Sequence, residues 1–111
     1  MKFDEDALVH AAARGDEKAQ CDLACHFLDQ VSGSLNREHG LGLTNAALTF
    51  AALAASNGLV SNIALYVRVL RQRLGWGNFL PGMEGEMRAL VAELEAATEG
   101  KRADERIEVR A

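Results

Sequence analysis

Residues 11–30 read AAARGDEKAQCDLACHFLDQ and contain the signals of two helices joined by a tight turn. Gly15 ends the first helix, because glycine accepts the positive φ that a helix C-terminus commonly needs. Asp16 follows directly, and its carboxylate can accept a hydrogen bond from the free amides of the next helix. Apolar residues then recur every three or four positions up to about Gln30. This stretch therefore predicts a helical hairpin.

Similar signals divide the remaining chain into helices and loops. Asp4 or Asp6 can cap the first helix, and Thr44 and Ser61 are the expected caps of the third and fourth. Helices are expected over residues 7–13, 17–30, 45–56, 62–74 and 83–97, with Gly-containing loops over 32–42 and 75–82. Aromatic residues make up only 5% of the chain, which favours closely packed helices over a sheet. The predicted fold class is all-α.

The composition is that of one small globular domain. The chain has 111 residues, of which 49% are apolar and 25% charged, so it can bury one modest core but cannot hold a multidomain enzyme. A formal charge of -4 lacks the positive surface that nucleic-acid binding needs. We expect the helical domain to cover residues 1–100 and the charged residues 101–111 to form a flexible tail. Within this tail, RIEVR alternates like a short edge strand.

A long stretch over residues 40–67 carries no charge and could cross a bilayer by its length. Polar side chains are spread along it, and Asn57-Gly58 ends a helix in its middle, so two buried helices are expected instead of a membrane span. The first residues lack the basic and apolar regions of a signal peptide. Cys21 and Cys25 lie one helical turn apart, where a disulfide would be strained. We therefore expect a reducing, cytoplasmic location.

The helix-turn-helix pattern occurs twice. Setting Gly15 over Gly58, 43 positions later, aligns two helix pairs and the double alanine before each glycine, at a period found in helical solenoids. Small residues let the two helices of such a hairpin touch, and the glycine permits the turn. Two stacked hairpins leave their ends uncovered, so the helix over 83–97 is the expected end cap. An unrelated bundle of four or five helices would carry the same signals.

The first copy resembles the Sel1-like repeat, a relative of the tetratricopeptide repeat. The matching residues are Ala12, Gly15, Asp16, Ala19, Gln20 and Leu23. The second copy fits at Ala47, Ala54, Ala55, Gly58, Ala64 and Leu65, with Leu59 at the acidic position and Asn62-Ile63 in place of Ala-Gln. The resemblance implies antiparallel hairpins stacked as a short solenoid. It also implies a non-catalytic adaptor or scaffold, whose concave surface grips a protein or peptide partner.

Candidate interaction residues come from the chain itself, because partner-binding residues vary within that family. Arg68, Arg71 and Arg73 could clamp an acidic peptide, or they could complement the C-terminus of their helix. Trp76 lies next to Phe79 in a predicted loop, where a large ring either plugs the end of the solenoid or anchors an interface. The candidate residues are Asn45, Thr49, Arg68, Arg71 and Trp76.

No pattern in the sequence indicates catalysis or a cofactor. Carboxylates gather at helix starts or on polar helix faces, and no glycine-rich stretch carries the lysine of a phosphate-binding loop. Cys21, Cys25 and His26 could contribute to a zinc sensor, but His26 is rotated by about 100° from Cys25 on a helix. We expect both cysteines to serve packing, with no metal site and no enzyme activity.

An apolar seam runs along the last predicted helix. It consists of Met83, Met87, Leu90 and Leu94 and spans about two heptads, which is too short for an independent coiled coil. We expect the seam to cover the fourth helix. Alternatively, it pairs two copies of the chain, which would then be a small self-associating regulatory or structural domain, a homodimer through the helix over 83–97.

Overall fold

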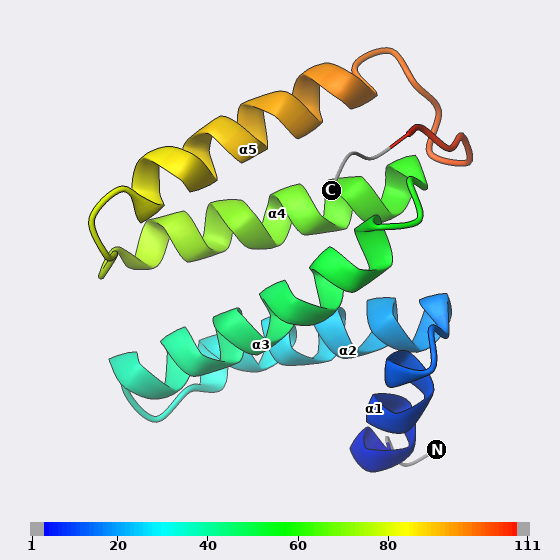
Figure 1. Cartoon of the computed structure of the whole chain (residues 1–111). Coiled ribbons are helices and arrows are strands. Elements are labelled where there is room, and N and C mark those ends of the chain that lie inside the picture. Colours follow the sequence, from blue (N-terminus) through cyan, green and yellow to red (C-terminus); the bar gives the residue numbers. More distant parts are fainter. Residues whose placement is uncertain (1–3, 109–111) are drawn as a thin grey trace.

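Five α-helices make up most of residues 4–108, the part of the chain that the computed structural model describes (Figure 1). The helices are α1 (Glu5–Ala13), α2 (Glu17–Gln30), α3 (Arg37–Ala55), α4 (Val60–Trp76) and α5 (Met83–Thr98). A 3₁₀ turn, Val31–Gly33, follows α2. Asp4 and Asp16 cap α1 and α2, as predicted. The all-α prediction is confirmed.

Two glycines turn the chain between paired helices. Gly15 and Gly58 have φ values of 97° and 83°, and the N–H of each donates to the carbonyl three residues earlier at 3.0 Å. The second helix of each pair also reaches back to the first. The side-chain amides of Gln20 and Asn62 donate to carbonyls near the ends of α1 and α3, at 3.0 and 3.1 Å. Asn62 therefore closes the second hairpin as Gln20 closes the first.

The start of α3 lies inside the predicted loop over residues 32–42. Asn36 caps the helix, because its Oδ1 accepts a hydrogen bond from the His39 N–H at 2.8 Å. Glu38 follows in the first turn, where a carboxylate complements the helix dipole. The loop prediction was wrong because each glycine lowers helix stability by only about 1 kcal/mol, which local capping and tertiary packing can overcome.

Gly40 and Thr44 adapt α3 to the end of α4. A Cβ at Gly40 would lie 2.5 Å from the indole of Trp76, so only glycine leaves room for this ring. Thr44 is buried and not a cap, since its hydroxyl donates to the Gly40 carbonyl at 2.9 Å. Trp76 is the last residue of α4 rather than part of the predicted loop over 75–82. The third helix therefore begins about two turns earlier than predicted. Its first turns pack against the end of α4.

The C-terminal segment caps the start of α4. The sequence predicted Ser61 as the N-cap of this helix. The N–H groups of Val60 and Ser61 donate to the carbonyls of Glu105 and Ala103, at 2.9 and 3.1 Å. Amides at a helix start have no partner within the helix, so they form hydrogen bonds either with another segment or with water. Here backbone carbonyls that lie more than 40 residues further along the chain do so.

Residues 101–108, the described part of the tail that was predicted over residues 101–111, lie against the helices. The Ile107 N–H donates to the Gly58 carbonyl at 2.8 Å, and the Ile107 side chain packs against the core. Leu59 and Arg106 form an isolated antiparallel bridge. Up to residue 108, the stretch RIEVR therefore contributes this single bridge and not an edge strand. Residues 109 and 110 of the stretch lie outside the described residues.

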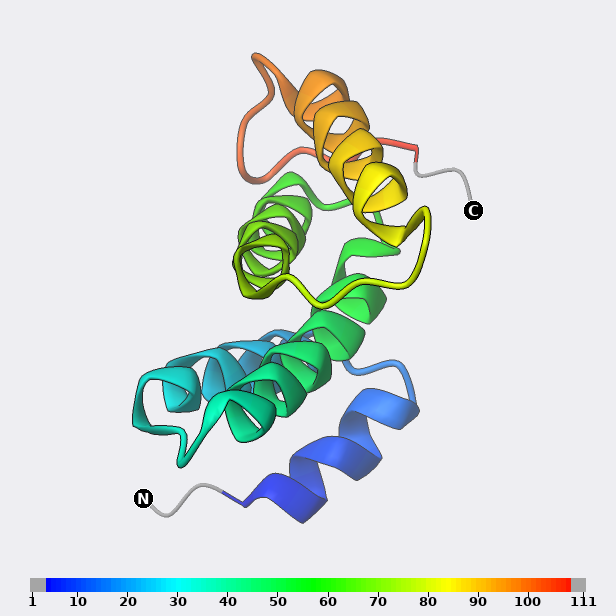
Figure 2. The ribbon, with the colours of Figure 1, turned by 90° about the vertical axis from the view of Figure 1, so that its left-hand side faces the viewer.

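The helices alternate between two sides of the molecule. Figure 2 shows α1, α3 and α5 toward one side and α2 and α4 toward the other. Helices that follow one another in the sequence pack together. Met87, Val91 and Leu94 of α5 share a buried cluster with Ile63 and Leu70 of α4. A second cluster, rich in alanine, joins α2, α3 and α4. The seam of α5 thus covers α4, as expected.

The uncharged residues 40–67 form most of α3 and the first half of α4. The turn at Asn57-Gly58 separates these two helices, as the sequence predicts. Among the helices of residues 4–108, none combines the length and the apolar character that a membrane span requires.

Candidate functional site

A groove of about 550 Å³ lies between α3 and α5, with α4 as its floor. The two wall helices lie on the same side of α4 (Figure 2), and each of them packs against it. Volumes of this size are typical of ligand pockets. The lining includes Ala52 and Ser56 of α3, Ile63 and Tyr66 of α4, and Leu90 and Glu93 of α5.

Helix periodicity aligns the side chains of both walls. Ala52 and Ser56 are one turn apart on α3, so both face the groove. Leu90, Glu93 and Ala97 follow at i, i+3 and i+7 on α5 and form the opposite row. Because the α3 side chains are small, the space between the two helices remains open.

The groove is uncharged on one side and acidic on the other. Its α3 wall and α4 floor come from residues 40–67, which contain no charged residue. Glu93 of α5 and Glu108 of the C-terminal segment bring negative charge to it. Neither carboxylate belongs to an ion pair within residues 4–108. By contrast, Glu95 on another face of α5 binds Arg71 through both carboxylate oxygens, at 2.7 and 2.6 Å.

Tyr66 supplies a polar group on the floor of the groove. Burial raises the pKa of its hydroxyl above the ordinary value, so the phenol stays neutral at physiological pH. Within residues 4–108 this hydroxyl has no hydrogen-bond partner. It is therefore able to donate a hydrogen bond to a molecule bound in the groove.

Two predicted interaction residues, Asn45 and Thr49, lie on α3. Asn45 has a structural contact, because its Oδ1 accepts a hydrogen bond from Arg73 Nε at 3.0 Å. Thr49 is exposed, and it precedes Ala52 and Ser56 by three and seven positions, so it continues their row. Of the two residues, Thr49 has the position of a groove residue, whereas Asn45 joins α3 to α4.

The predicted arginine cluster is dispersed. Arg68 is exposed beside Leu28 and Asp29 of α2, whereas Arg71 reaches Glu95 of α5. Arg73 is only 3% exposed. These three guanidinium groups therefore do not form the clamp for an acidic peptide that the sequence suggested.

Arg73 holds the end of α4 together. Its guanidinium donates to the carbonyls of Gly77 and Asn78 at 2.7 and 3.2 Å, in addition to Asn45. It also lies 4.7 Å above the centre of the Phe79 ring. A buried cation needs such hydrogen bonds to replace its hydration. For Arg73, these contacts agree with the alternative interpretation of the sequence, in which an arginine complements a helix C-terminus.

Trp76 is a packing residue between α3 and α4. Its ring lies against Gly40, and its Nε1 is buried without a hydrogen-bond acceptor in the described part of the chain. The Arg37 guanidinium lies 5.5 Å from the centre of the ring and donates to the Trp76 carbonyl. The ring therefore fills the end of a helix pair and is partly covered by Arg37.

The cysteines of α2 are free thiols that face neighbouring helices. Cys21 Sγ donates to Asn62 Oδ1 at 3.2 Å. Burial raises the pKa of both Cys21 and Cys25, which lowers the fraction of the reactive thiolate. Within residues 4–108, no three His, Cys, Asp or Glu side chains gather as a metal site requires. The Cys21 thiol thus joins α2 to α4.

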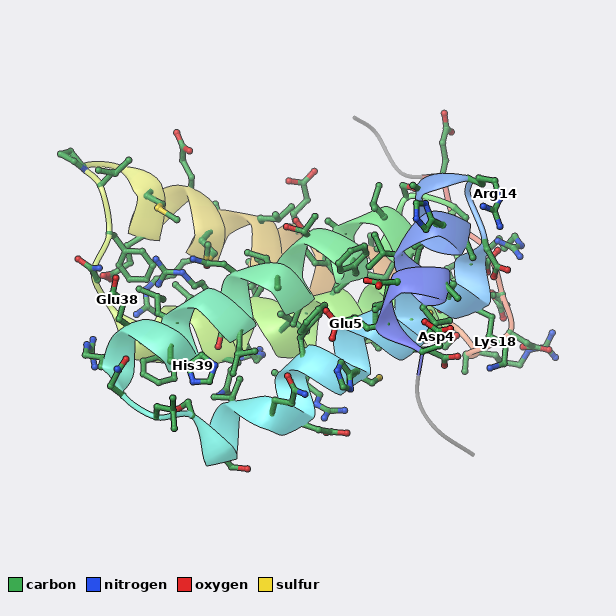
Figure 3. The ribbon with its side chains drawn as sticks, turned by 90° about the horizontal axis from the view of Figure 1, so that it is seen from below. Asp4, Glu5, Arg14, Lys18, Glu38 and His39 are labelled. Atoms are coloured by element: carbon green, nitrogen blue, oxygen red, sulfur yellow. The ribbon has the colours of Figure 1, made fainter. Side chains whose placement is uncertain are left out.

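Ionisable side chains are spread over the surface. Figure 3 shows Asp4, Arg14 and Lys18 toward one end of the molecule and Glu38 and His39 toward the other. Asp4 Oδ1 accepts the Ala7 N–H at 3.1 Å, and His39 Nδ1 accepts a backbone N–H at 3.0 Å. Asp4 and His39 thus make local capping contacts, whereas Glu5 Oε2 lies 3.4 Å from His26 Nε2 of α2.

No family model matches the sequence, and neither a curated protein nor a solved structure is significantly similar to the chain.

The sequence reasoning missed the α5 wall and Tyr66. Two signals for the groove were present: the uncharged stretch over 40–67, and Glu86 and Glu93 one heptad apart on the last helix. These signals indicate a groove only when the positions of α3 and α5 on the same side of α4 are known.

Proposed function

We propose that this chain is a non-catalytic adaptor that holds a segment of a partner protein in the groove between α3 and α5. The observation that carries the proposal is the groove itself, which is largely apolar and open between two wall helices. Apolar surface that stays exposed to water contributes nothing to stability. Burial of a partner's apolar side chains in the groove would contribute favourable free energy to binding. Neither a catalytic constellation nor a metal cluster accompanies the groove within residues 4–108.

The likeness of the two hairpins supports a Sel1-like solenoid as the framework of this adaptor. Gly15 and Gly58 make similar turns, and Gln20 and Asn62 make similar closing contacts. The first, third and fifth helices lie toward one side of the molecule (Figure 2), as in a solenoid whose alternate helices line one face. We also propose a cytoplasmic location, because both cysteines are free thiols.

Self-association through the apolar seam of α5 is the less favoured function. Met87 and Leu94 are already buried against α4, and a homodimer formed through them would have to expose α4. The adaptor function requires no such opening.

Affinity capture from native lysate tests the adaptor proposal with two matched variants. Ala52→Trp adds a large ring to the groove wall, whereas Ala64→Trp adds the same ring to an exposed position on α4. Both variants must first show the helix content and the melting temperature of a folded protein. We expect proteins retained by the native chain and by Ala64→Trp to be lost from Ala52→Trp. Equal retention by all three proteins contradicts the proposal.

A further inference from the structure

We propose that the occupant of the groove between α3 and α5 is a basic amphipathic helix, an inference that rests on the proposed adaptor function. Such a helix would place its apolar side chains on the α4 floor and its Lys or Arg side chains along α5. Three properties favour this occupant: the charge of the two walls, the shape of the lining and the hydrogen-bonding needs of the bound backbone.

The charge of the α5 wall selects basic side chains. Glu93 lines the groove, and Glu86 lies one heptad earlier, so helix geometry places it in the same row. Both carboxylates are exposed, and neither forms an ion pair within the described residues. Glu108 adds a third negative group at the end of the groove. A partner with Lys or Arg along this edge would meet complementary charge.

The opposite wall selects a close, uncharged approach. Ala52 and Ser56 of α3 have short side chains, which allow the backbone of a neighbouring helix to come near. No charged residue of α3 lies between Gly40 and its end. The two walls therefore fit a helix that is basic on one flank and small or polar on the other.

The backbone of the occupant favours a helix over an extended peptide. The walls and the floor are α-helices, whose interior N–H and C=O groups are already paired with one another. An extended segment in this groove would find few backbone partners, and unpaired polar groups are costly in an apolar site. A helix satisfies its own backbone and can lay apolar residues at i, i+3 or i+4 and i+7 onto the partly exposed side chains of Tyr66, Leu90 and Ile107.

The test uses two synthetic helices of about 15 residues, the length at which an isolated helix becomes marginally stable. Both carry the same leucines on one face, but one carries lysines on its flank and the other carries glutamates. Binding to the native chain is measured by fluorescence anisotropy at low and high salt. We expect saturable binding of the lysine peptide that weakens with salt, and binding at least about tenfold weaker for the glutamate peptide.

A pair of variants locates the charge effect. Glu86→Lys combined with Glu93→Lys reverses the α5 wall, whereas Asp29→Lys combined with Glu38→Lys makes the same change of net charge outside the groove lining. The groove variant should lose the lysine peptide and prefer the glutamate peptide, while the control should keep the native preference. If the groove variant fails to fold, the neutral Glu86→Gln and Glu93→Gln pair should still weaken the lysine peptide.

Three results would overturn the inference. They are equal binding of both peptides, no saturable binding of the lysine peptide, and equal effects of the groove and control variants. Failure of the peptide test together with loss of lysate partners from Ala52→Trp refutes only the basic helix and leaves the adaptor function. Retention of all partners by Ala52→Trp refutes the adaptor function itself. Self-association that blocks peptide binding would identify a second copy as the occupant.

Discussion

Replacement of Gly58 with alanine should release the C-terminal segment from the start of α4. Gly58 has a φ of 83°, and a Cβ there would lie 2.0 Å from the Ile107 carbonyl oxygen. This backbone oxygen cannot rotate away as a side-chain end could, so the segment itself must move. The move breaks the hydrogen bond from the Ile107 N–H to Gly58 and those from Val60 and Ser61 to the segment.

Gly15→Ala provides the reference for the size of the effect. Gly15 has a φ of 97° but no atom within 4 Å of an added Cβ, so alanine there costs only the left-handed backbone strain of about 1–2 kcal/mol. Gly58→Ala carries the same strain and also loses three hydrogen bonds, each with a net value of about 0.5–1.5 kcal/mol. We expect Gly58→Ala to lower the free energy of unfolding by about 2.5–6.5 kcal/mol.

Urea unfolding of both variants gives the free energies, and amide hydrogen exchange shows where the structure has changed. The Val60, Ser61 and Ile107 amides should lose protection in Gly58→Ala and keep it in Gly15→Ala. Equal destabilisation of the two variants, with these three amides protected in both, would contradict the capping of α4 by the C-terminal segment.

Two further predictions concern close packing and titration. Gly40→Ala should lower stability by about 1–3 kcal/mol because its Cβ meets the Trp76 ring, whereas Gly42→Ala, with open space around the Cβ, should raise it by about 0.5–1 kcal/mol; urea unfolding that ranks them equally contradicts this packing. Burial raises the pKa of Cys21 and Cys25 above their ordinary value of 9.0, so their contribution to stability is complete below pH 9 and is lost as the pH rises further. Urea unfolding under reducing conditions should therefore show a smaller loss of stability between pH 8 and about pH 10 for the double serine variant than for the native chain; equal losses would contradict it.

Much of the helical fold could be predicted because its signals are local. Asp4 and Asp16 cap helices through carboxylates three residues from the amides that they accept from. Gly15 and Gly58 make turns that depend on a single backbone φ. The start of α3 was missed although Asn36 is also a local cap, because the glycines that follow it resembled a loop. One of them, Gly40, leaves room for Trp76, which lies on a different helix.

The candidate site was much less predictable from the sequence. The predicted interaction residues lie in different surroundings: Asn45 binds Arg73, Arg71 binds Glu95, and Trp76 fills a space beside Gly40. Each role depends on a contact between residues far apart in the chain. Thr49 continues a wall of the groove, but the wall is recognisable only from its opposite side.

The sequence by itself determined the helical class, the two glycine turns and the apolar faces, because capping, backbone conformation and periodicity act over a few residues. Only the tertiary structure decided that residues 101–108 cap α4, that Arg73 is buried and that α3 and α5 leave a groove between them. These features depend on which surfaces meet in space. A helix start without partners, such as that of α4, is satisfied by whichever segment the fold brings to it, and the open groove results from two helices that pack on the same side of a third.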